Sequence, residues 1–287
     1  MKSIAIIGSS PIMLILANLL MKKANEVIIY DINPRVGGAW SYYEYEGSRI
    51  NTQTNVIVPA NKEEEKSFNE INDYLRSEFD IEIKEDLGEN KPLGYLSKKN
   101  YLYDLQNLFL TIKNFQIIKK KIDSIHLKDN IIHIDNKKYD KIFIPYFGGV
   151  EDFYTKNQHF KLPYNIIISE HVLILAKKIK YKKISYSENF DEFFDRIQIR
   201  NFTNFSSFTA RVRREHKGTE IDTLINNSEI NKYLDGKLLS KLFKYRNFYR
   251  SEEQLNKLKK IDDFDQVNII NTFQFFEGFL DLKSKFL

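Results

Sequence analysis

The sequence of 287 residues predicts an α/β protein in which a parallel sheet is followed by an antiparallel sheet with helices. Residues 3–7 and 26–31 are short apolar runs, typical of strands that are buried on both faces in a parallel sheet. Residues 11–23 between them predict a helix, because proline suits its first turn and lysines suit its C-terminus. A strand, a helix and a strand within about 30 residues form one crossover unit, which we expect to be right-handed.

The elements up to residue 150 follow from similar patterns. Apolar residues at helical spacing predict helices over 67–78 and 99–113. The acidic run 63–66 is interpreted as a solvated charge run, and 49–58 are expected to be extended. Further strands are expected at 115–121, 123–127, 130–134 and 139–145, the last of which returns the chain to the first sheet.

The second half of the chain has a different pattern. Segments rich in β-branched and aromatic residues within 164–215 predict a set of antiparallel strands. The lysine-rich stretch 228–260 is expected to be helical, and 267–287 are expected to form a strand and a final helix. We therefore predict three regions: a dinucleotide-binding half from 1–60 and 110–150, a helical insertion at 61–110, and a substrate or cap region at 151–287.

Composition excludes several classes of protein. The chain has no cysteine, which excludes disulfides and thiolate metal sites, and its five histidines have no metal-binding spacing. No apolar run approaches the roughly 20 residues that cross a bilayer, and we expect a cytoplasmic location without a transmembrane segment. The net charge of +5 is spread along the chain, so no nucleic-acid partner is expected. A small-molecule substrate is expected, and a homo-oligomer stays open.

The turn after the first strand is a candidate phosphate site. A helix N-terminus has unpaired N–H groups and a partial positive charge, which favour a phosphate. Asp31 ends the second strand, where a carboxylate accepts hydrogen bonds from a ribose. The usual G-x-G-x-x-G spacing would place glycines at Ser10 and Met13, and the bulk of Met13 is unusual where helix and strand pack closely. An ordinary α/β unit with one glycine in its first turn remains the alternative. The candidate cofactor-binding residues of this turn are Gly8, Ser9, Ser10 and Pro11.

A glycine pair follows Asp31 at a fixed offset. Asp31, Arg35, Gly37 and Gly38 together resemble the continuation found in flavoproteins of the amine oxidase, protoporphyrinogen oxidase and UDP-galactopyranose mutase group. The resemblance implies a Rossmann-like fold that binds FAD. It implies that Asp31 holds the adenosine ribose and that Arg35 lies near the phosphates. Gly37 and Gly38 would let the backbone pass against the flavin, and Trp40 would lie close to the isoalloxazine ring.

Residues 201–220 resemble a strand pair of the UDP-galactopyranose mutase-like proteins. That resemblance implies that Arg211 and Arg213 bind the pyrophosphate of a nucleotide sugar. The matching residues are Asn201, Phe202, Thr209, Arg211, Glu215, His216 and Lys217. The chain departs from these mutases at two places: the segment 49–61 after the glycine pair contains no histidine, and 270–273 contain neither the glycine nor the arginine of the family.

Three functions follow as hypotheses. The first is an FAD-binding flavoenzyme that acts on a small substrate, for which a nucleotide sugar is one candidate. The second is an amine- or carbon-oxidising flavoprotein oxidoreductase. The third is a non-catalytic nucleotide-binding protein, or a relic of the fold that acts in a protein complex, and NAD(P) is the alternative cofactor. Function depends on the site and not on the fold, so the sequence assigns no catalytic residue.

Overall fold

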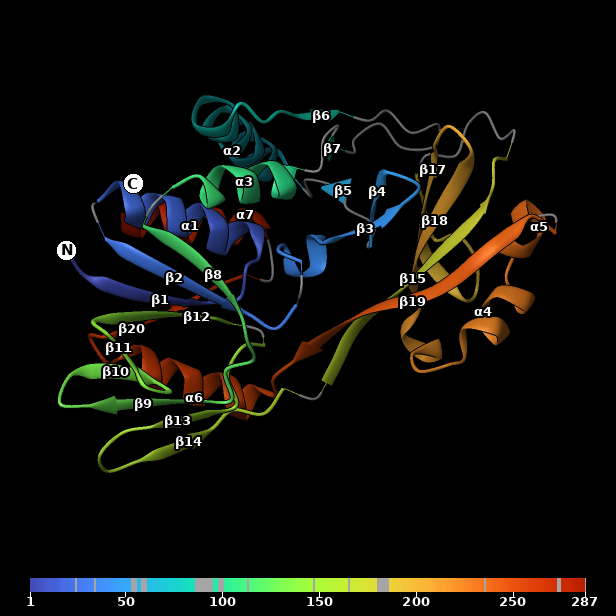
Figure 1. The fold of residues 1–287 in the computed structure, drawn as a ribbon. Coiled ribbons are helices and arrows are strands. Elements are labelled where there is room, and N and C mark those ends of the chain that lie inside the picture. Colours follow the sequence, from blue (N-terminus) through green and yellow to red (C-terminus); the bar gives the residue numbers. More distant parts are fainter. Residues whose placement is uncertain are drawn as a thin grey trace.

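The computed structural model describes residues 1–287 except 24, 34, 53–55, 58–60, 86–94, 98–100, 113, 147, 165, 180–185, 235, 273–274 and 287. Its centre is a five-stranded parallel sheet with the order β20-β12-β1-β2-β8 (Figure 1). Ile6 lies opposite Phe143 on one side and Ile29 on the other, so β1 is a central strand, as predicted. The strands are β1 (Ser3–Ile7), β2 (Glu26–Asp31), β8 (Phe115–Lys119), β12 (Lys141–Pro145) and β20 (Val267–Ile270).

Four helices cover one face of the parallel sheet (Figure 1). Met13 in the first of them is completely buried among the apolar residues of this layer, so the helix accommodates the side chain at the position of the third glycine. The helix predicted over 99–113 ends at Leu110. The helices are α1 (Pro11–Lys22), α2 (Lys62–Phe79), α3 (Tyr101–Leu110) and α7 (Phe275–Phe286).

A small sheet and α6 (Glu252–Asp262) cover the opposite face (Figure 1). Its strand order is β11-β10-β9-β13-β14, and Ile125 in β9 packs with Ala5 in β1 and Leu258 in α6. The parallel sheet is therefore buried on both faces. The strands are β9 (Ser124–Lys128), β10 (Ile131–Ile134), β11 (Lys137–Tyr139), β13 (Asp152–Tyr154) and β14 (His159–Lys161).

An antiparallel sheet with the order β16-β17-β18-β15-β19 forms the second half (Figure 1). The short helices α4 (Ile221–Asn227) and α5 (Ile230–Leu234) pack against one of its faces. The hairpin of β3 (Tyr42–Tyr45) and β4 (Ser48–Asn51) packs against the other, where Ile50 meets Leu173. The sheet strands are β15 (Ile166–Lys177), β16 (Tyr186–Glu188), β17 (Phe194–Asn201), β18 (Phe205–Val212) and β19 (Leu238–Tyr249).

A three-stranded sheet with the order β5-β7-β6 is formed by β5 (Val56–Ile57), β6 (Ile83–Glu85) and β7 (Tyr95–Ser97). The extended segment predicted at 49–58 corresponds to β4 and β5, and positions 53–55 and 58 lie outside the described residues. None of the described helices is both long and apolar enough to cross a membrane.

One local prediction is wrong, and one helix begins earlier than predicted. Residues 238–249, expected to be helical, form the long strand β19, because pairing along β15 and contacts such as Leu242 opposite Leu173 outweigh the lysine-rich composition. The helix predicted over 67–78 begins earlier, at Lys62, so α2 includes the solvated charge run 63–66. Asn61 caps that helix by accepting hydrogen bonds from the N–H groups of Glu63 and Glu64, and acidic side chains in a first turn favour the helix dipole.

The predicted boundary at residue 150 does not separate the sheets. β13 and β14 extend the small sheet of the first half, and β20 pairs with β12, with Val267 opposite Ile142. The chain therefore leaves the first half through β15 and returns through β19. Long-range parallel pairing of this kind leaves no local signal in the sequence.

Candidate cofactor site

The turn between β1 and α1 places a helix N-terminus at the carboxyl end of a central strand. Gly8 has a φ of 83°, and its N–H donates to the carbonyl of Tyr30 at 2.7 Å. Ser10 is the N-cap residue and Pro11 is the first helical residue. The Ser10 side chain caps no N–H group, and its Oγ is enclosed without a hydrogen-bond partner among the described residues. The first turn of α1 has no acidic residue, so neither a side-chain cap from Ser10 nor an acidic group compensates its positive end.

Ser9 ties the turn to the two segments that the sequence singled out. Its backbone N–H donates to Asp31 Oδ2 at 2.8 Å, and its hydroxyl donates to the same oxygen. The hydroxyl oxygen accepts from the N–H of Gly37 at 3.0 Å. Asp31 Oδ1 accepts from the N–H of Asn33 at 2.8 Å, which leaves that oxygen capacity for a further donor. Three segments up to 28 residues apart are thus held in one network.

The glycine pair adopts a backbone that other residues rarely adopt. Gly37 has a φ of 117° and Gly38 a φ of 54°, and Trp40 N–H closes the turn on the Gly37 carbonyl at 2.9 Å. Trp40 packs, partly buried, against the core layer of α1. Two consecutive residues with positive φ explain why the sequence places glycines side by side here.

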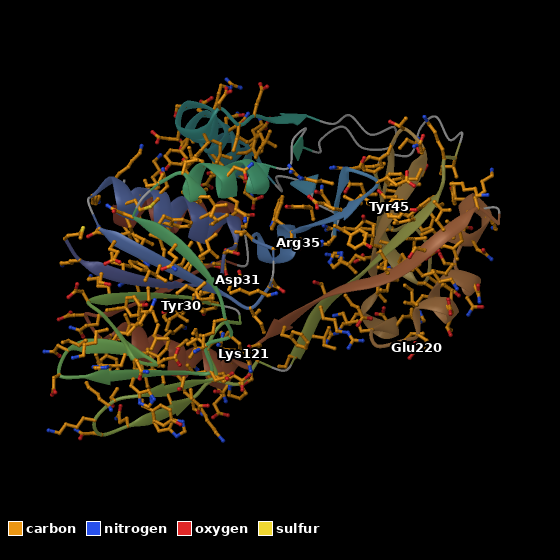
Figure 2. All side chains as sticks on the ribbon, viewed as in Figure 1. Tyr30, Asp31, Arg35, Tyr45, Lys121 and Glu220 are labelled. Carbon is orange, nitrogen blue, oxygen red and sulfur yellow. The ribbon has the colours of Figure 1, made fainter. Side chains whose placement is uncertain are left out.

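Arg35 is held against the hairpin that follows the glycine pair. Its Nη1 donates to the carbonyl of Tyr42 at 3.0 Å, and its guanidinium lies 5.6 Å from the ring centre of Tyr43. Figure 2 shows Asp31 and Arg35 in the middle of the molecule, on the side of the parallel sheet that faces the antiparallel sheet, whereas Tyr45 lies against the antiparallel sheet.

A glycine loop that the sequence analysis did not assign lies next to Gly8. It follows β12, and a Cβ on Gly149 would lie 3.1 Å from both Ile7 Cγ2 and Pro145 Cγ. Gly149 also has a φ of 94°, so two independent constraints require glycine here. The signal was available in the sequence: the pair Gly148-Gly149 closely follows the buried strand that was predicted to return to the first sheet.

Arg250 fixes this loop from within the protein. Its side chain is fully buried and donates to the carbonyls of Tyr146, Val150 and Leu162 at 3.2, 2.6 and 3.0 Å. Burial lowers the pKa of the guanidinium to about 10, which still leaves it charged at neutral pH. Because Arg250 follows β19 directly, it joins the crossing strands to the glycine loop.

The predicted substrate arginines have partners within the antiparallel half. Arg211 forms a bidentate ion pair with Asp195, in which Nε lies 2.8 Å from both carboxylate oxygens. Arg213 Nε donates to the carbonyl of Asp191 at 2.6 Å. These contacts join the start of β17 to the end of β18, and a pyrophosphate would have to compete with Asp195 for the guanidinium of Arg211.

The hairpin brings the antiparallel sheet to the glycine-pair loop. Thr52 donates from both its N–H and its hydroxyl to the carbonyl of Ser41, which directly follows Trp40, at 3.2 and 3.0 Å. Thr209 Oγ1 in β18 donates to the Asn51 carbonyl at 3.2 Å.

No group of three candidate metal ligands is found within the described residues.

His171, in β15, predicts an acid-sensitive stability. Burial, followed by the charges of Arg211 and Arg196, lowers the pKa of this imidazole to about 3. The unfolded chain therefore binds a proton near pH 6.5 that the folded protein excludes, and stability falls as pH drops from about 6.5 towards 3, by about 1.4 kcal/mol per unit. Urea unfolding at pH 7 and 5 measures the loss. We expect the free energy of unfolding to fall less between pH 7 and 5 in His171→Gln than in the unmodified protein. An equal fall in both proteins would contradict the assignment of the acid sensitivity to His171.

Comparison with known proteins gives structural but no sequence matches: no protein-family profile and no curated sequence matches the chain. The CLA-producing fatty acid isomerase from P. acnes has a TM-score of 0.63 and 11% identity, covering 100% of this chain and 99% of that one. A protein assigned as a protoporphyrinogen oxidase from Exiguobacterium sp. 255-15 has a TM-score of 0.54 and 9% identity, covering 94% and 93%. Putrescine oxidase bound to putrescine has a TM-score of 0.55 and 10% identity, covering 99% and 97%.

These identities establish similarity of the fold. The α/β class, with its parallel sheet and separate antiparallel sheet, is confirmed. The chain therefore has the fold of the amine oxidase and protoporphyrinogen oxidase-like flavoproteins, the group suspected from Asp31, Gly37 and Gly38.

Proposed function

We propose that the protein is an FAD-binding flavoprotein oxidoreductase that acts on a small substrate. The observation that carries the proposal is the uncapped N-terminus of α1, joined through Ser9 to Asp31 and to the positive-φ Gly37. The Ser10 Oγ at this N-terminus is enclosed and has no hydrogen-bond partner among the described residues. A phosphate oxygen of the cofactor would supply that partner. The fold similarity to putrescine oxidase and the isomerase supports the same conclusion.

The residues present fit the two ends of such a cofactor. The N–H groups of the first turn of α1 and the Ser10 hydroxyl would hold the pyrophosphate. Asp31 Oδ1, which has one backbone donor, would accept from a ribose hydroxyl. Gly37 and Gly38 would let the chain pass the flavin, and Arg35 would add positive charge near the phosphates. When bound, the flavin supplies hydride or electron acceptance, and the protein supplies orientation and electrostatics.

The choice between reactions follows from the arginines. A nucleotide-sugar mutase would use Arg211 and Arg213 for the pyrophosphate, and both have partners inside the protein. The oxidation of an amine or a carbon centre does not require Arg211 and Arg213 to bind a pyrophosphate. We therefore place oxidation of a small molecule first, with the mutase reaction second. NAD(P) binding is the alternative that the experiment below separates from FAD binding, and a non-catalytic role in a complex is the third candidate.

Substitution of Gly37 tests the proposed cofactor site. Gly37→Ala adds a side chain at a φ of 117° and shifts the N–H that binds Ser9, so we expect FAD affinity to fall about tenfold or more. Gly236→Ala is the matched control, since it also forces positive φ (67°) but lies between α5 and β19. Affinity is measured by FAD titration with NADP as the competing probe. Equal affinities in the two variants, or tighter binding of NADP than of FAD, would contradict the proposal.

A further inference from the structure

One face of the antiparallel sheet carries a row of polar residues. The alternate residues Ala210, Val212 and Ile197 pack beneath the sheet with α4 and α5. Side chains alternate between the faces of a strand, so their neighbours point to the opposite face, the one that contacts the hairpin. The register places Arg211 between His171 and Arg196, and Thr209 next to Gln198. We call this set the polar row; it consists of His171, Arg196, Gln198, Thr209 and Arg211.

Two members of the polar row are buried without a partner. His171 is 4% exposed, and its Nδ1 has no hydrogen-bond partner in the part of the chain that the structure describes. Gln198 is 2% exposed and its Nε2 has none either. An enclosed polar atom without a partner costs about 1–3 kcal/mol, and native proteins retain few of them. Two on the same sheet face, on strands that flank β18, indicate a place where a ligand supplies the missing partner.

The charge of the polar row is positive. Asp195 neutralises Arg211, whereas Arg196 forms no ion pair with any described residue. His171 is uncharged at neutral pH because burial and the two arginines lower its pKa to about 3. The guanidinium of Arg196, which lies opposite Glu188 in the register of β16 and β17, and the Gln198 amide donor thus remain for a ligand. A cation would be repelled here, while a carboxylate would find donors for both oxygens.

Two hydrogen bonds connect the polar row, through the end of the hairpin, to the proposed flavin loop. Thr209 is bonded to Asn51, and Thr52 is bonded to Ser41, which follows Trp40. We propose that the polar row binds the carboxylate of an anionic substrate, with Arg196 and Gln198 as its donors. This inference rests on the proposed function, because it assigns the substrate class of the same site. It excludes diamines as the preferred substrates of this protein.

The test compares two ligands with the same tail and opposite charge. Octanoate and octylamine are titrated into the FAD-treated protein by calorimetry, and flavin content is measured separately by visible absorption. We expect octanoate to bind at least tenfold more tightly than octylamine. Arg196→Gln should weaken octanoate binding about tenfold through loss of a charge-assisted hydrogen bond, and Arg196→Glu should reverse the preference. Arg76→Gln is the control, an exposed arginine on α2; thermal melting confirms that each variant folds.

The outcomes separate the two proposals. Octanoate binding that depends on Arg196 supports the inference, even if no flavin is retained and the proposed function fails. Retained flavin with octanoate binding that is absent, is equal in Arg196→Gln, or is weaker than that of octylamine overturns the inference and leaves the flavoprotein proposal standing. If the protein binds neither flavin nor octanoate, both proposals are overturned. Should both Arg196 variants fail to fold, Gln198→Leu takes their place with the same expected tenfold loss and the same contradicting results.

Discussion

Arg250→Met should destabilise the folded protein by about 3–5 kcal/mol, since it removes the three bonds to buried carbonyls and leaves the acceptors unpaired. The affected carbonyls belong to the loop after β12 and to Leu162, between β14 and β15, so the loss falls where the crossing strands β15 and β19 join the first half. Arg250→Lys keeps a charge but cannot reproduce the planar fork, and it should be intermediate. Urea unfolding followed by circular dichroism measures these differences.

The control for this prediction is Arg76→Met, which removes an exposed arginine paired with Glu82 at 3.0 Å. Exposed pairs contribute about 0–1 kcal/mol, so this variant should unfold close to the unmodified protein. If Arg250→Met were as stable as Arg76→Met, the buried guanidinium would not be holding the glycine loop, and the proposed link between the crossing strands and the loop would be wrong.

Asp31→Asn should lower FAD affinity about hundredfold. The carboxylate accepts from Ser9 twice and from Asn33 once, and an amide would replace one acceptor oxygen with a donor that faces these groups. Charge-assisted hydrogen bonds of this kind contribute about 1.5–3 kcal/mol each. Because Ser9 also binds Gly37, the substitution disturbs the glycine pair as well as the ribose position.

Asp140→Asn is the matched control for Asp31→Asn. Asp140 Oδ2 accepts from the N–H of Ser3 at 2.8 Å, which is the same kind of contact at the opposite end of β1. Fluorescence titration with FAD compares the two variants. Comparable affinities for FAD would show that the Asp31 network does not form part of the cofactor site.

The first crossover was predictable because its signals are local. Each signal lies within a few residues of the element it predicts: the apolar run of β1, Pro11 at the start of α1 and Asp31 at the end of β2. Gly37 and Gly38 were also recognisable, because positive φ restricts the residue type. β19 was not predicted, because its lysine-rich composition suggested a helix and the strand forms by pairing with β15, which lies far away in the sequence.

The contacts that complete the site depend on distant segments. Ser9 forms hydrogen bonds with both Asp31 and Gly37, and nothing in its immediate sequence indicates that it joins these two segments. Arg250 reaches carbonyls 88 to 104 residues away. Met13 illustrates the reverse error: judged against the glycine pattern it is too large, yet the α1 layer buries it completely.

The central claim, that the α1 turn and the glycine pair form an FAD site, is tested most directly by a visible absorption spectrum. The purified protein is incubated with FAD, excess cofactor is removed by gel filtration, and the spectrum of the protein fraction is recorded. We expect a retained flavin spectrum with close to one FAD per chain, lost in Asp31→Ala. A colourless protein fraction, with no shift in melting temperature on addition of FAD, would contradict the claim.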